Sequence, residues 1–246
     1  MADVFFCPKF CTMKAMLTQI GKNFLNLFYP HLCIACQDEI SSNEDILCLT
    51  CSLKLPKTNF HLYKENPFTD RFWGRLSLEN GAALYHFVKG GKTQHLIHNL
   101  KYKGRKDIGS KLGKWYGRQL KKSAYFNDIQ LIIPVPLHPR KERKRGYNQS
   151  YHFAKGLSES MNIRIDTTTL VRKEFTISQT EKSRIERFEN VIKAFEVRYP
   201  DQLKNKHILL VDDVITTGAT LEACGIKLLK IEGVQLSMAT IAIANT

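Results

Sequence analysis

The chain has 246 residues, is 43% hydrophobic and carries a formal net charge of +14. This length suits one sizeable domain with an appendage, and no apolar run reaches the roughly 18 residues that a membrane-spanning helix requires. Lys9, Lys14 and Lys22 interrupt the N-terminal region, which argues against a secretory signal and favours a cytoplasmic protein. The net charge favours polyanionic partners, either nucleic acid or phosphorylated small molecules, without choosing between them.

Residues 1–30 are predicted to form an N-terminal extension with one amphipathic helix. Apolar residues recur at helical spacing from Ala15 to Phe28, and Pro30 ends the pattern. Such a helix packs on the main domain or, as the less favoured alternative, on a membrane surface or a partner.

Four of the seven cysteines form two close pairs within residues 31–56. The pairs are Cys33-x2-Cys36 and Cys48-x2-Cys51, a spacing typical of a tetrahedral four-cysteine zinc site. The alternative is two disulfides, which are rare in the cytosol, so spacing and compartment together favour zinc. Four thiolates leave no open position on the metal, and we therefore expect a structural zinc rather than a catalytic one.

Residues 57–80 are predicted to connect this zinc module to a main domain at residues 81–246. The rings of Phe68, Phe72 and Trp73 either stack nucleic-acid bases or, as the favoured alternative, pack the small module on the large one.

The main domain alternates short apolar runs with helical patterns. Strands are expected at residues 82–88, 131–133, 167–171, 208–211 and 236–244, and helices from residue 96 and at residues 112–120, 151–160 and 221–231. This order predicts an α/β fold with a mainly parallel sheet covered by helices on both faces.

The segment after the strand at 131–133 is predicted to be a cationic loop. Residues 137–150 carry five Lys or Arg side chains against one Glu. Pyrophosphate requires several positive donors, and ligands of α/β domains bind at the carboxyl ends of strands, which favours a pyrophosphate site over a nonspecific basic patch. The candidates are Val135, Pro136, Leu137, His138 and Arg140, followed by Lys103, Arg145, Asn148 and Gln149.

Two further polar segments belong to the main domain. The basic run at 101–106, which contains Lys103, is either a solvated loop or an anion-binding edge. Residues 172–184 are polar and lack periodicity, and we expect them to form a mobile lid over a ligand.

Residues 207–220 have the outline of a phosphosugar site. An apolar strand leads to the carboxylates of Asp212 and Asp213, and a Thr/Gly loop and a helical pattern follow. Hydroxyls and main-chain N–H groups at a helix N-terminus bind phosphate, and carboxylates accept hydrogen bonds from ribose hydroxyls. An ordinary Thr N-cap explains one hydroxyl, but neither the two carboxylates nor the other threonines.

This stretch resembles the 5-phosphoribosyl-1-pyrophosphate (PRPP) signature of type I phosphoribosyltransferases. The resemblance implies that Asp212 and Asp213 bind the ribose hydroxyls and that the following loop surrounds the 5′-phosphate. The loop residues concerned are Thr216, Thr217, Gly218, Ala219 and Thr220. Mg²⁺ is expected to accompany PRPP, bridging pyrophosphate and ribose oxygens.

Further motifs, in the same order, resemble the ComF family of phosphoribosyltransferase-like competence proteins of bacteria. After the cysteine pairs come Lys-Tyr-Lys-Gly-Arg at 101–105, Pro-Val-Pro-Leu-His-Pro-Arg at 134–140, Arg-Gly-Tyr-Asn-Gln-Ser at 145–150 and the PRPP signature. The resemblance covers the chain from about Phe28 and departs from the family at Tyr147 and Lys182. It implies a link to natural transformation, with single-stranded DNA handled at the inner face of the membrane and DNA-uptake proteins as partners.

Three functions agree with these motifs. The favoured one is a DNA-uptake protein that binds PRPP, a related phosphoribosyl ligand or single-stranded DNA. Arg143, Lys144 and Arg145 are its DNA-binding candidates because they belong to the densest run of positive charge. The alternatives are a phosphoribosyltransferase acting on a nucleobase or amine with Mg-PRPP, and a PRPP-sensing regulator. No residue is assigned to activating an acceptor, so enzymatic activity stays open.

Overall fold

The computed structural model describes residues 31–40, 45–173 and 190–244. The chain divides into two compact units, Met1–Lys54 and Leu55–Thr246. The predicted amphipathic helix at 15–28 and the predicted lid beyond residue 173 lie outside the described residues.

The first unit is organised by the turns that carry its cysteines. In the first turn, Gln37 donates its main-chain N–H to the Cys33 oxygen over 2.8 Å and adopts a positive φ of 68°. Helix α2 (Leu49–Lys54) begins directly after Cys48 and carries Cys51 on its buried side. Both cysteine pairs therefore lie on tight turns, which brings their sulfur atoms close together.

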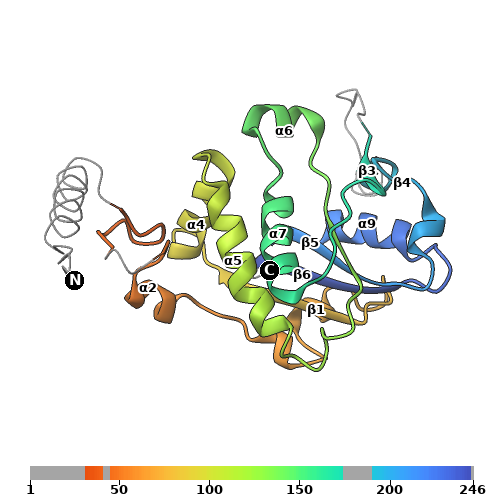
Figure 1. The fold of residues 1–246 in the computed structure, drawn as a ribbon, viewed down its shortest axis with the longest axis horizontal. Helices are drawn as coiled ribbons and strands as arrows, with labels where there is room; N and C mark the ends of the chain where they lie inside the picture. Colours follow the sequence, from red (N-terminus) through yellow and green to blue (C-terminus); the bar gives the residue numbers. More distant parts are fainter. Residues whose placement is uncertain (1–30, 41–44, 174–189, 245–246) are drawn as a thin grey trace, which may run out of the picture. The chain divides into compact units, whose positions relative to one another are not determined.

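The second unit is built on a four-stranded parallel sheet, which confirms the predicted α/β class (Figure 1). The strands, in their order across the sheet, are β1 (Asn80–Phe87), β6 (Gln235–Ala244), β5 (His207–Ile215) and β2 (Leu131–Pro134). The central strands β5 and β6 are buried along most of their length, as expected for a sheet covered on both faces.

Helices flank this sheet. They are α4 (Lys92–Tyr102), α5 (Lys106–Leu120), α7 (Gln149–Met161) and α9 (Ala219–Leu228). Helices α5 and α7 pack against each other, α7 also packs on β2 and β5, and α9 packs on β5. Helices α5 and α7 approach closely because glycines face each other; a Cβ on Gly156 would lie 2.0 Å from the Ser110 oxygen. None of the helices in the described ranges is both long and apolar enough to cross a membrane.

Two short strands, β3 (Leu170–Arg172) and β4 (Phe195–Val197), form a separate antiparallel pair. In the sequence, β3 precedes residues 174–189 and β4 follows them. The short 3₁₀ helix η2 (Pro200–Leu203) then leads into β5. Arg172, expected at the start of a lid, is thus the last residue of a strand.

The prediction of a loop at 137–150 is wrong for the central residues, because Pro139–Arg145 form helix α6. His138 caps this helix by accepting a hydrogen bond from the Arg140 N–H at Nδ1, over 3.2 Å. Proline suits the first helical position because no N–H donor is needed there, and Gly146, with φ of 78°, ends the helix. Helix α6 buries none of its side chains, so its sequence shows no apolar periodicity.

Residues 57–80, expected as a connector, lie within the second unit. They form the 3₁₀ helix η1 (Phe60–Leu62) and helix α3 (Pro67–Asp70). Phe68 and Phe72 are fully buried and so cannot stack on bases, whereas Trp73 is 88% exposed. Phe68 lies against Gly81 of β1, where a Cβ would approach its ring within 2.4 Å. The segment is therefore part of the packed core of this unit.

Candidate functional site

The carboxyl ends of β1, β2 and β5 surround a cavity of about 530 Å³. Parallel strands present these ends at one edge of the sheet, which is where ligands of such folds bind. The cavity is lined by the end of β1, helix α4, the loop after β2, part of α6, the end of β3 and the segment from Asp212 to Thr220. Its walls therefore come from residues spread over more than half of the sequence.

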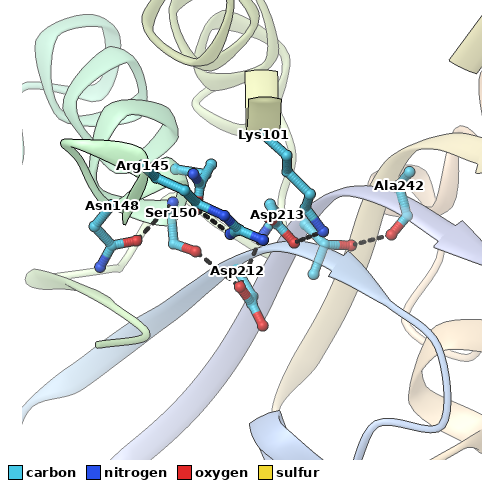
Figure 2. A network of polar contacts seen from close by, with 9 residues as sticks. Lys101, Arg145, Asn148, Ser150, Asp212, Asp213 and Ala242 are labelled. Atoms are coloured by element: carbon cyan, nitrogen blue, oxygen red, sulfur yellow. Dashed lines mark hydrogen bonds and ion pairs between the residues drawn. The ribbon is translucent and has the colours of Figure 1, made fainter. Parts of the chain in front are cut away.

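The acidic pair lies within β5, which continues to Ile215 rather than ending before the carboxylates. Asp212 accepts a hydrogen bond from the Ser150 hydroxyl over 2.7 Å and another from the Asp213 N–H over 2.8 Å. Asp213 forms an ion pair with Lys101, with 3.0 Å between Oδ1 and Nζ. Figure 2 shows Ser150 beside the carboxylate of Asp212 and Lys101 reaching that of Asp213.

The carboxyl group of Asp212 has a raised pKa. Burial, followed by the charge of neighbouring Asp213, raises the pKa of Asp212 from 3.8 to about 7. The hydrogen bonds from Ser150 and the Asp213 N–H, and the charge of Lys101, act in the opposite direction but do not outweigh burial. Without a bound cation, Asp212 is therefore close to half-protonated at neutral pH.

The Thr/Gly loop joins β5 to α9 and encloses a second, small cavity of about 40 Å³. Thr216 and Thr217 are exposed, and Gly218 has φ of 84°, a conformation that favours glycine. Thr217 Oγ1 accepts a hydrogen bond from the Ala219 N–H over 3.4 Å. The first N–H groups of α9 and the threonine hydroxyls together form a site suited to a phosphate.

Four long cationic side chains line the larger cavity: Lys101 of α4, Lys141 and Arg145 of α6, and Arg172 of β3. Arg145 is oriented by two neighbours, since Nη1 donates to Gln149 Oε1 over 2.8 Å and its guanidinium lies 5.3 Å from the Tyr102 ring centre. Burial lowers the pKa of Arg172, whose Nε finds no hydrogen-bond partner among the described residues. These cations balance the acidic pair and could bind further phosphate groups.

The structure sorts the pyrophosphate candidates into two groups. Val135, Pro136, Leu137 and Arg145 line the cavity. Of the others, His138 caps α6, Asn148 caps α7 and donates to the Val135 oxygen over 2.9 Å, and buried Gln149 holds Arg145. Lys103 and Arg140 are exposed, as are the DNA-binding candidates Arg143 and Lys144, and none of these four is among the described lining residues.

Sequence reasoning missed Lys101, Ser150 and Arg172. Lys101 belongs to the basic run that was singled out, but the choice of Lys103 ignored the helical phase that directs residue 101 toward the sheet. Ser150 follows the N-cap of α7, and its role depends on a contact with β5. Arg172 was hidden because the strand that carries it is only three residues long.

The four cysteines of the first unit form one cluster. Their Sγ atoms all lie within 4.8 Å of one another, and Cys36 and Cys48 are 3.7 Å apart. Tetrahedral zinc with Zn–S bonds of about 2.3 Å would separate neighbouring sulfurs by about 3.8 Å, so the cluster fits this metal. Burial raises the pKa of Cys33, but main-chain hydrogen bonds at Cys36, Cys48 and Ala35 outweigh it and hold that pKa at about 7.

A parallel sheet with an acidic pair, a Thr/Gly loop and a helix N-terminus at its carboxyl edge defines a phosphoribosyltransferase-like protein. In agreement, the family model of the phosphoribosyl transferase domain matches residues 148–245.

Proteins of known sequence extend this similarity over most of the chain. The DNA utilization protein YhgH of Escherichia coli O6:H1 is 34% identical over 216 residues, which cover 79% of this chain and 89% of that protein. Competence protein F of Haemophilus influenzae is 26% identical over 85% of this chain and 94% of its own. Competence protein ComFC of Bacillus subtilis is 21% identical over 77% and 85%. The chain belongs to the ComF family of phosphoribosyltransferase-like proteins.

Among solved structures, a purine phosphoribosyltransferase from Pyrococcus horikoshii Ot3 aligns with a TM-score of 0.36 and 19% identity. The alignment covers 54% of this chain and 71% of that one. The family assignment therefore rests on the sequence relatives.

The raised pKa of Asp212 predicts a pH-dependent effect of the substitution Asp212→Asn. In the unfolded chain this carboxyl loses its proton near pH 3.8, whereas the folded protein retains it up to about pH 7. The folded state thus binds more protons in this window, and the stability of the natural protein falls as the pH rises through it. The variant, which has no charge at this position, should melt several degrees higher at pH 8.

The advantage of the Asp212→Asn variant should grow between about pH 4 and pH 7 and then stay constant. Asp201→Asn is the matched control, because the Asp201 side chain is 83% exposed. Differential scanning calorimetry from pH 4 to pH 8 measures both variants. An equal melting temperature of Asp212→Asn and the natural protein at pH 8 contradicts a buried, poorly compensated carboxylate.

Proposed function

We propose that this protein binds PRPP, or a closely related phosphoribosyl ligand, together with Mg²⁺ at the carboxyl edge of its sheet. The observation that carries the proposal is the combination, in one region, of an acidic pair, a Thr/Gly loop at a helix N-terminus and four cationic side chains. PRPP offers the complementary groups, which are the ribose hydroxyls, the 5′-phosphate and the pyrophosphate.

Each part of the ligand has a corresponding set of residues. Asp212 and Asp213 would accept hydrogen bonds from the ribose hydroxyls, and the loop at 216–220 would bind the 5′-phosphate. Lys101, Arg145 and Arg172 would bind the pyrophosphate. Mg²⁺, held by the acidic pair directly or through water, would neutralise charge between the carboxylates and the pyrophosphate oxygens.

We further propose that the protein serves DNA uptake by contacting single-stranded DNA. The relatives named as DNA utilization and competence proteins support this role. A structural observation favours the surface of α6: Arg140, Arg143 and Lys144 are exposed, whereas Arg145 of the same helix lines the cavity. The helix thus presents one set of charges to solvent and another to the ligand. Phosphoribosyl transfer stays the alternative, because we assign to none of the described lining residues a role in activating an acceptor.

We propose zinc as the metal of the four-cysteine cluster. Its role would be structural, since four thiolates complete a tetrahedral shell and leave no site for a substrate. A unit of this size buries little apolar surface, so metal binding would supply much of its folding free energy.

Replacing both carboxylates by amides, Asp212→Asn with Asp213→Asn, should abolish binding of Mg-PRPP in isothermal titration calorimetry. The amides remove the acceptors for the ribose hydroxyls and the negative charge that attracts Mg²⁺. Thr217→Val, which removes one phosphate donor, should weaken binding by about 1–3 kcal/mol. The matched control is Asp201→Asn with Glu232→Gln, two exposed acidic residues. Retained affinity in the double aspartate variant refutes the site.

Replacing Arg140, Arg143 and Lys144 together by Ala should lower the affinity for a short single-stranded oligothymidylate. Because each contact with a single strand contributes about 0.7 to the salt slope, the slope should flatten by up to about two units. Fluorescence anisotropy at several salt concentrations measures both quantities. A control with the same charge change replaces the exposed residues Arg118, Lys121 and Lys122. An α6 variant with the affinity and slope of the natural protein excludes this surface.

Purified protein should contain about one equivalent of zinc by elemental analysis. The variant Cys36→Ser should lose it, because three thiolates no longer close the shell, whereas Cys224→Ser, at a buried position in α9, should retain it. Zinc-free protein in which Cys33, Cys36, Cys48 and Cys51 form two disulfides in mass spectrometry contradicts the assignment.

A further inference from the structure

A segment that precedes the sheet reaches the Thr/Gly loop at 216–220, called the phosphate loop here. It lines neither of the two cavities at that edge. This segment, residues 67–76, is called the clamp segment here, and its central residue is Arg71. The Arg71 guanidinium donates from Nη1 to the main-chain oxygen of Thr216 and from Nη2 to that of Ala244, the last residue of β6. One side chain thus ties the phosphate loop to the neighbouring strand end.

The contact with Thr216 has a consequence for the phosphate-binding groups. In a trans peptide the C=O and the following N–H point in opposite directions. Holding the Thr216 oxygen toward Arg71 therefore directs the Thr217 N–H to the opposite side of the loop. Arg71 orients a donor of the phosphate site in this way without touching the ligand.

The neighbouring residue supports the same loop by packing. Phe72 is fully buried, and a Cβ on Gly218 would lie 3.2 Å from its ring. The ring occupies the space beside the glycine whose positive φ begins α9. A side chain at position 218 would therefore meet both conformational strain and this ring.

The contacts continue in register along α9. Arg75 forms an ion pair with Glu222, with 2.6 Å between Nη1 and Oε2, and the Glu222 side chain is only 6% exposed. One turn further, a Cβ on Gly225 would lie 2.8 Å from Leu76 Cδ1. Residues at both ends of the 71–76 stretch thus contact the loop and the first two turns of the helix in the same chain order.

We propose that the clamp segment fixes the conformation of the phosphate loop and that Arg71 is its positioning residue. The segment lies outside residues 148–245, which match the phosphoribosyl transferase domain, and so adds a support to that domain from the preceding part of the chain. The predicted effect on ligand affinity rests on the proposed phosphate site, whereas the predicted effect on loop order does not.

The test compares Arg71→Met, Arg71→Lys and the control Arg118→Met in the full-length protein. Arg118 is an exposed arginine of α5, so its replacement changes the net charge equally. Hydrogen–deuterium exchange should be faster in residues 214–222 of both Arg71 variants, with unchanged exchange in β2 and α7. Lysine keeps the charge but cannot hold two carbonyl oxygens with one planar group, so it should not restore natural exchange.

Ligand binding supplies the second readout. Affinity for ribose 5-phosphate should fall about tenfold in Arg71→Met, whereas affinity for Mg-pyrophosphate should stay the same, because only the 5′-phosphate loop is disturbed. Natural exchange in residues 214–222 of Arg71→Met overturns the clamp, and so does natural exchange in Arg71→Lys if the methionine variant fails to fold. If the natural protein binds no ribose 5-phosphate but exchange in the loop rises in the variants, the ligand proposal fails and the clamp stands.

Discussion

The site depends on the cost of placing two adjacent carboxylates in a buried strand. Burial and mutual repulsion raise the pKa of Asp212 to about 7, while Asp213 is held by the ammonium of Lys101. Ser150 donates a further hydrogen bond to Asp212. The helices that supply these partners, α4 and α7, are thereby fixed against β5 at the edge where ligands bind. A divalent cation at this position would relieve the remaining repulsion, which supports the proposal of a metal-bound sugar phosphate.

Neighbouring cationic side chains of helix α6 have different surroundings. Arg145 points into the cavity and is held by Gln149 and the Tyr102 ring, whereas Arg143 and Lys144 of the same short helix are exposed. A ligand in the cavity and a nucleic-acid strand on α6 would therefore contact adjacent but different side chains.

Local sequence signals predicted the parts of this account that depend on neighbouring residues. The strand, Thr/Gly loop and helix after residue 207, the alternation that gives a parallel sheet, and the paired cysteines each lie within one short stretch. The parts that depend on distant contacts were missed. Helix α6 buries no side chain and so lacks periodicity, the choice between Lys101 and Lys103 depends on packing, and Arg71 reaches partners far along the sequence.

The most direct test of the central claim is a titration of the Asp212 carboxyl carbon by NMR, with and without saturating Mg-PRPP. We predict a pKa near 7 in the free protein, because the carboxylate is half-buried beside Asp213. With Mg-PRPP bound, the same carboxyl should stay ionised to well below pH 5, because a cation and hydroxyl donors stabilise its charge. Identical titration curves in the two states would contradict the assignment of this acidic pair to the ligand.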